Sequence, residues 1–123
     1  MADMKLEGMD ELLAEIERLG KAGNRIENAA LREAGDAVKT SIQNETPTRS
    51  GKLKASISVS RVKTKGGIKQ VEVGPGPDGY YGKFLEFGTV KMKANPFMSR
   101  GYETSKGEAE RIIEEEIRKG LGL

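Results

Sequence analysis

The sequence contains no cysteine, no histidine and no tryptophan, and the first two absences exclude several kinds of chemistry. Without histidine there is no Ser-His-Asp or Cys-His nucleophile pair, no HExxH zinc helix and no imidazole base that titrates near neutral pH. Without cysteine there is no disulfide framework, no thiolate nucleophile and no zinc ribbon. Carboxylates, lysines, hydroxyls and backbone groups remain. The sequence therefore predicts a protein that is not an enzyme and carries no metal or cofactor.

Long apolar runs are also missing. No segment approaches the roughly 20 apolar residues that a membrane span needs. The first twenty residues carry acidic side chains where a secretory signal would have a basic stretch and an apolar run. We therefore expect a soluble protein that is not exported and has no membrane partner. The 123 residues are enough for a single domain, residues 1–123, with its own hydrophobic core.

The charged residues are unevenly distributed, although the net charge is only +2. Residues 1–46 hold 10 acidic and 6 basic side chains, a balance of −4. Residues 47–102 hold 3 acidic and 11 basic side chains (+8), and residues 103–123 hold 6 acidic and 4 basic side chains (−2). The middle of the chain is therefore basic between two acidic ends.

Two helices are expected in the first part of the chain. Apolar residues recur at helical spacing from Met9 to Leu19, and we expect residues 1–22 to form an N-terminal helix that is loosely attached to the domain. An unbroken i,i+4 row of apolar residues then runs from Ile26 to Ile42. Pro47 ends this second helix, because proline disfavours helical geometry at the residue before it.

The next segment predicts a β-hairpin. After a short helical turn at residues 50–54, apolar and polar residues alternate, and a glycine-rich turn separates this strand from the returning strand, Ile68–Val73. The turn is either the two residues Gly66 and Gly67 or a three-residue loop that also includes Lys65. We favour the three-residue loop, because it places Val59 opposite Val73 and collects the apolar residues of both strands on one face.

The rest of the chain predicts a short helix over residues 81–88, a third strand over Val90–Ala94, and a final helix that runs to about Lys119. Asn95 and Pro96 are typical of the N-cap and the first residue of a helix. The predicted fold class is therefore α+β. It has N-terminal helices, a small antiparallel sheet built on a β-hairpin, and a C-terminal helix packed on the sheet.

Two catalytic or nucleotide-binding motifs match by chance. The glycines of residues 74–79 fit the dinucleotide pattern G-x-G-x-x-G, but two prolines in the same loop remove N–H groups that would bind a pyrophosphate. Ser60 and Lys63 fit the pattern S-x-x-K, but in a strand their side chains point to opposite faces. The glutamates of the last helix are typical of a solvated helix face.

The basic stretch from Arg49 to Lys69 holds seven basic residues and no acidic residue. Such a stretch can bind nucleic acid. It contains no aromatic residue on which a base could stack, so contact with an acidic protein surface is the favoured interpretation and nucleic-acid binding is the alternative.

All six aromatic residues lie between residues 80 and 102. Most of them are expected in the core, where a short helix packs on the last helix. Six rings exceed what a small sheet needs to cover it, so we expect one or two of them to be exposed for a partner.

Two segments carry a family resemblance: YYGKFLEFGTVKMKANPFM at residues 80–98 and PTRSGKLKASI at residues 47–57. The first contains Glu-Phe-Gly-Thr followed by a basic link and Pro-Phe, and the second contains Pro-x-x-Ser-Gly-x-Leu-x-x-Ser-Ile. Both resemble the "gene ten" family of lambdoid tailed bacteriophages, which are small virion proteins of the junction between head and tail. The resemblance covers about residues 25–105.

The resemblance implies a non-enzymatic phage or prophage structural protein, a tail-completion or connector component that acts in a hexameric ring. The implied partners are further copies of the chain, the portal or connector protein and the tail-tube protein, with no small-molecule substrate. The implied location is the virion, and the host cytoplasm before assembly.

The expected contact joins the basic hairpin of one subunit to an acidic helical face of the next. Glu86 and Thr89 are candidate interaction residues that have an alternative, structural role. In that role Glu86 accepts local hydrogen bonds and Thr89 donates to carbonyl groups after Gly88. The candidate interaction residues are Arg61, Lys63, Lys65, Lys69, Tyr80, Tyr81, Glu86, Phe87, Thr89 and Phe97.

Overall fold

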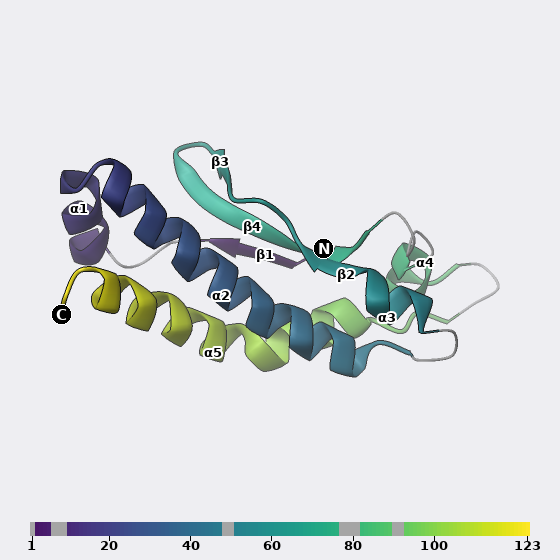
Figure 1. Ribbon diagram of the computed structural model, residues 1–123. Helices are drawn as coiled ribbons and strands as arrows, with labels where there is room; N and C mark the ends of the chain where they lie inside the picture. The colour runs from purple at the N-terminus through teal and green to yellow at the C-terminus, as the bar shows by residue number, and fades with distance from the viewer. Residues whose placement is uncertain (1, 6–9, 48–50, 77–81, 90–92) are drawn as a thin grey trace.

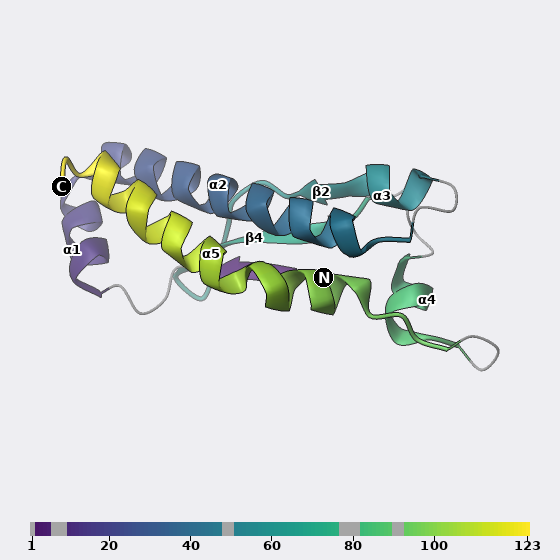
Figure 2. The ribbon, with the colours of Figure 1, turned by 90° about the horizontal axis from the view of Figure 1, so that it is seen from below.

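The computed structural model describes residues 2–5, 10–47, 51–76, 82–89 and 93–123. Its elements follow the order β1 (Ala2–Lys5), α1 (Asp10–Arg18), α2 (Lys21–Glu45), α3 (Lys52–Ser56), β2 (Ile57–Val59), β3 (Lys63–Lys65), β4 (Ile68–Pro75), α4 (Gly82–Phe87) and α5 (Phe97–Gly120). They form two layers, an antiparallel sheet and a pair of helices, α2 and α5, that run side by side in opposite directions (Figure 1 and Figure 2). α2 covers β2 and β4, and α5 contacts β1. The predicted α+β fold class is confirmed.

α2 holds the central position because of its apolar row. The row is completely buried from Ala30 to Ile42, as its spacing predicts. Beside the row, Gly35 lets the sheet come close, since a Cβ atom at this position would lie 2.8 Å from Cγ1 of Val59. Small residues on α2 therefore set the separation between the helix layer and the sheet.

α5 turns a buried stripe towards α2, and its members are Phe97, Met98, Gly101, Ser105, Ala109, Ile113 and Ile117. Ile112, beside this stripe, is partly buried and packs against the same core. The two helices pack tightly at Gly101, where an added Cβ would lie 2.6 Å from Cα of Ile42.

The register of the sheet agrees with the prediction at Val59 but not at the hairpin turn. Val59 lies opposite Val73, as predicted, but Lys65 lies opposite Ile68, so the turn consists of Gly66 and Gly67 alone. The predicted three-residue loop is therefore wrong. Both pairings are possible because the three residues 60–62 lie opposite only two residues of β4. The extra residue forms a β-bulge.

The bulge is held by Ser60. Its N–H donates to the carbonyl oxygen of Glu72 at 2.8 Å, and its Oγ accepts from the N–H of Glu72 at 2.9 Å. The extra residue shifts the side-chain alternation by one position, so Lys63 and Lys65 fall on the same sheet face as Glu72, away from the helices.

The N-terminus contributes a strand that the sequence does not predict. β1 pairs with β4 along its whole length, from Ala2 opposite Val73 to Lys5 opposite Gln70. In the following helix, Ile16 is 1% exposed and belongs to the hydrophobic core. These contacts join the described residues 2–5 and 10–18 to the rest of the fold. The expected third strand at Val90–Ala94 lies mostly outside the described residues, and its last two positions are not in a strand.

The glycine turn of the hairpin gives a first testable prediction. Gly66 and Gly67 have φ values of 57° and 78°, the left-handed region, and a Cβ at either position would meet nothing within 4 Å. Gly66→Ala should therefore lower the free energy of unfolding by about 1 kcal/mol through backbone strain alone. Gly66→Asn should leave it nearly unchanged, because asparagine tolerates this conformation. Urea denaturation of both variants measures the difference, and equal losses would contradict the prediction.

Candidate interaction surface

The outer face of the hairpin carries the exposed positive charge. Nζ of Lys63 and Nζ of Lys65 lie 3.8 and 3.5 Å from the carboxylate oxygens of Glu72, and both lysines are exposed. Arg61, in the bulge, is exposed as well, and its guanidinium group makes no ion pair with any described residue. Two lysines share one carboxylate and Arg61 pairs with no described residue, so the hairpin keeps an excess of positive charge.

Lys69 differs from the other three candidate bases of the hairpin. Its side chain is 20% exposed and points to α2, where Nζ donates to Oδ1 of Asn28 at 3.1 Å and lies 3.7 Å from Oε2 of Glu27. This lysine joins the sheet to α2 within one subunit. It does not lie on the same face as Lys63 and Lys65.

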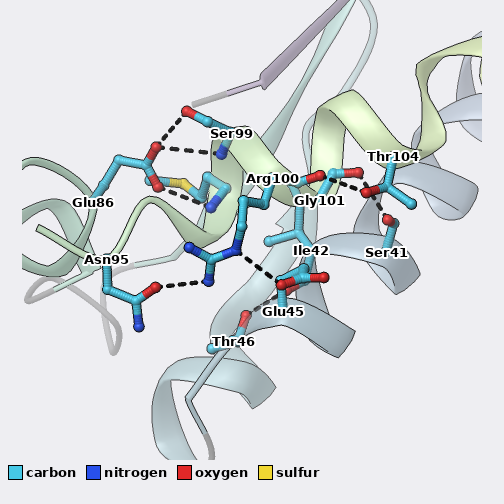
Figure 3. Close-up of polar contacts among 11 residues, drawn as sticks. Ser41, Ile42, Glu45, Thr46, Glu86, Asn95, Ser99, Arg100, Gly101 and Thr104 are labelled. Carbon is cyan, nitrogen blue, oxygen red and sulfur yellow. Dashed lines mark hydrogen bonds and ion pairs between the residues drawn. The ribbon is translucent and has the colours of Figure 1, made fainter.

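Glu86 is the best-defined polar residue of the candidate surface. Its side chain comes from α4, is 5% exposed and points at the start of α5 (Figure 3). Oε1 accepts a hydrogen bond from the N–H of Met98 at 2.8 Å, and Oε2 accepts from the N–H and Oγ–H of Ser99 at 3.3 and 2.5 Å. The carboxylate therefore satisfies N–H groups that α5 leaves open in its first turn, and it lies at the positive end of the helix dipole.

The predicted N-cap at Asn95 is therefore wrong. Pro96 occupies the N-cap position, and the side chain of Asn95 accepts a hydrogen bond from Nη2 of Arg100 at 2.7 Å instead. Nε of the same arginine donates to Oε2 of Glu45 at 3.0 Å, which links the end of α2 to the start of α5 (Figure 3). A residue from α4, rather than the neighbouring asparagine, caps α5.

The aromatic candidates divide into buried and exposed. Phe97 is 0% exposed and lies in the core, whereas Phe87 is 76% exposed at the end of α4. Gly88 then reverses the chain with φ 77°, and the exposed Thr89 follows. Tyr80 and Tyr81 lie outside the described residues. The expectation that one or two rings are exposed is met by Phe87 among the side chains that the structure describes.

A pocket of about 340 Å³ opens beside the hairpin. Arg32 and Asp36 of α2 line one side, and Val59, Ser60 and Arg61 at the end of β2 line the other. The sequence reasoning missed Arg32 and Asp36. Their i,i+4 spacing places them on one face of α2, but nothing in the sequence says that the bulge lies opposite.

The described ranges contain no group of three or more acidic residues arranged to hold a metal ion. None of the helices within those ranges combines the length and the hydrophobicity that a membrane span requires.

The fold and this surface define a small α+β protein. Its distinctive surface features are an exposed basic hairpin, an exposed phenylalanine and an open pocket. The chain belongs to the HK97-gp10-like family, described as "Bacteriophage HK97-gp10, putative tail-component", whose model matches residues 10–88. The predicted phage family is thus confirmed, and the protein has a structural role in a bacteriophage. No curated protein and no solved structure matches the chain.

Proposed function

We propose that this protein is a non-enzymatic component of the head-tail junction of a phage or prophage, a tail-completion or connector subunit that assembles into a hexameric ring. The observation that carries the proposal is the separation of charge between the two layers. The basic hairpin lies in the sheet layer, and residues 103–123, which have a net charge of −2 and include most of α5, lie in the helix layer (Figure 1). A ring built head to tail needs two different and complementary faces.

The contact between neighbouring subunits joins the hairpin of one copy to the acidic face of α5 of the next. Arg61, Lys63 and Lys65 supply the positive side, because among the described residues Glu72 is shared by the two lysines and Arg61 has no ion pair. Lys69 is not part of this contact, since Glu27 and Asn28 already bind it. The negative side is supplied by the exposed glutamates of α5, which are Glu103, Glu108, Glu110, Glu114 and Glu115. Four of them form exposed i,i+3 or i,i+4 ion pairs on α5, and such pairs are weak enough to exchange for a contact with a neighbouring subunit.

Charge reversal on the hairpin tests the proposal. Lys63→Glu combined with Lys65→Glu should abolish ring formation, measured by native mass spectrometry, and incorporation into virions, measured in a complementation assay. The variant should stay folded, because exposed ion pairs contribute at most about 1 kcal/mol each to stability. Lys21→Glu combined with Arg25→Glu makes the same charge change on exposed positions of α2 and should leave assembly intact. Normal rings from the hairpin variant would refute the proposed contact.

The further copies of the chain, the portal or connector protein and the tail-tube protein are the proposed partners, with the virion as the final location and the host cytoplasm as the place before assembly. Nucleic-acid binding by residues 49–69 remains the alternative. Binding to duplex DNA at submicromolar affinity with a steep salt dependence would favour that alternative. No binding at low salt would remove it.

A further inference from the structure

The pocket beside the hairpin exists because β2 is short. The bulge at residues 60–62 interrupts the regular pairing with β4 and leaves the flank of α2 uncovered next to it. A bulge and a charged residue are features that protect an edge strand from pairing with another strand. The pocket is therefore suited to a side chain rather than to an added strand.

Two arginines of the pocket form no ion pair with any residue that the structure describes. Four of the seven described arginines do pair within the chain: Arg18 with Glu15, Arg100 with Glu45, Arg111 with Glu115 and Arg118 with Glu114. Arg25 forms no such pair either, but it does not line the pocket. The guanidinium groups of Arg32 and Arg61 pair with no described residue, although both are exposed on the two sides of one pocket. Two uncompensated guanidinium groups that face one space indicate a place where a partner group binds.

An aromatic ring can contact the arginines, the valine and the aspartate of this pocket, whereas an anion can use only the arginines and Ser60. A guanidinium group stacks on the face of a ring, and the methyl groups of Val59 offer apolar contact. The third charged residue of the pocket is Asp36, whose carboxylate repels a phosphate or another carboxylate but attracts the positive edge of a ring.

The chain itself presents such a ring. Phe87 is the exposed aromatic among the side chains that the structure describes, and it follows Glu86, whose three hydrogen bonds fix α4 to α5. A ring held out on a fixed helix loses little conformational freedom when it binds. α4 lies at the end of the molecule, beyond the C-terminal end of α2, whereas Arg32 and Asp36 belong to the middle of α2 (Figure 1 and Figure 2). Phe87 does not lie in the pocket of its own subunit.

We infer that Phe87 of one subunit inserts into the pocket formed by Arg32, Asp36, Val59, Ser60 and Arg61 of the next subunit. The inference rests on the proposed function, because it specifies how neighbours in the ring join. Each copy has one ring to insert and one pocket to receive, which makes the contact heterologous and able to close a ring. The pocket adjoins the basic hairpin through Arg61, and α4 adjoins α5 through Glu86, so this contact lies beside the charge contact.

A mixing experiment tests the insertion. Phe87→Ala removes the inserted ring, and Arg32→Ser combined with Arg61→Ser removes both guanidinium groups from the pocket. Each variant alone should associate roughly 30-fold or more weakly than the wild type, as expected when a central aromatic or arginine contact is lost. A mixture of the two should form dimers and nothing larger, because only the intact ring of one variant and the intact pocket of the other can pair. Phe87→Tyr should still assemble, since it keeps an aromatic face.

The outcomes separate this inference from the proposed function. If the wild type forms no oligomer at any concentration or in the presence of virion components, both are overturned. If the wild type forms rings and the variants also form rings, the ring stands and the insertion is overturned. If only Phe87→Ala fails, the phenylalanine binds elsewhere, and the pocket assignment is wrong. Circular dichroism of each variant confirms that it is folded, and p-benzoylphenylalanine at position 87 should cross-link to the peptide that contains Val59 or Asp36.

Discussion

Gly101→Ala should lower the free energy of unfolding by about 2–3 kcal/mol, although alanine is the better helix former. A Cβ at this position would lie 2.6 Å from Cα and 2.8 Å from N of Ile42, and backbone atoms of a packed helix cannot move aside cheaply. Ser41 Oγ also donates to the carbonyl oxygen of Gly101 at 2.8 Å, across the same contact (Figure 3). Separation of α2 from α5 would stretch this bond and open the core beside Ile42.

Gly107→Ala is the matched control in the same helix. Gly107 is exposed, and a Cβ there would meet nothing within 4 Å. This substitution should raise stability by about 0.5–1 kcal/mol, the gain in helix propensity alone. Urea denaturation of the two variants should thus give changes of opposite sign. A gain in both would mean that α2 and α5 do not approach each other closely at Gly101.

The parts of the fold that depend on local periodicity were predictable. The buried row from Ala30 to Ile42 follows from i,i+4 spacing, and the pairing of Val59 with Val73 follows from the need to keep apolar residues on one face. The hairpin turn was not predictable, because the three-residue loop was chosen on the assumption that the two strands pair without a β-bulge. Ser60 supplies a hydroxyl acceptor for the N–H of Glu72, and this hydrogen bond satisfies the N–H group where the bulge interrupts the regular strand pairing.

The parts that depend on distant partners were not predictable. β1 has only four residues and pairs with a strand more than sixty residues away, so its own pattern carries little signal. Phe87 and Phe97 both belong to the same aromatic-rich segment of the sequence, yet one is exposed and the other is buried. α4 is only six residues long and is fixed by Glu86, so the residue after Glu86 at the helix end faces solvent. The pocket likewise combines residues of α2 and β2 that no spacing connects.

Glu86→Ala should lower the free energy of unfolding by about 2–3 kcal/mol, because it leaves the buried N–H of Met98 without an acceptor and removes the charge from the start of α5. Glu86→Gln should cost about half as much, since one amide oxygen can still accept a hydrogen bond while the amide nitrogen cannot. Ser99→Ala removes only the hydroxyl donor and should cost about 1 kcal/mol. Chemical denaturation of the three variants should give this order.

The part of α5 that loses protection from amide hydrogen exchange in Glu86→Ala distinguishes a capping role of Glu86 from a general packing role. Amide hydrogen exchange in Glu86→Ala should accelerate at Met98 and Ser99 and remain slow from Ala109 to Ile117, where the helix is held by the core. Because Glu86 also fixes the helix that presents Phe87, this variant should assemble as poorly as Phe87→Ala even at a temperature where it is fully folded. Uniformly faster exchange along α5 would show that Glu86 has a general packing role rather than a capping role. Normal assembly of the folded variant would show that Glu86 does not position Phe87.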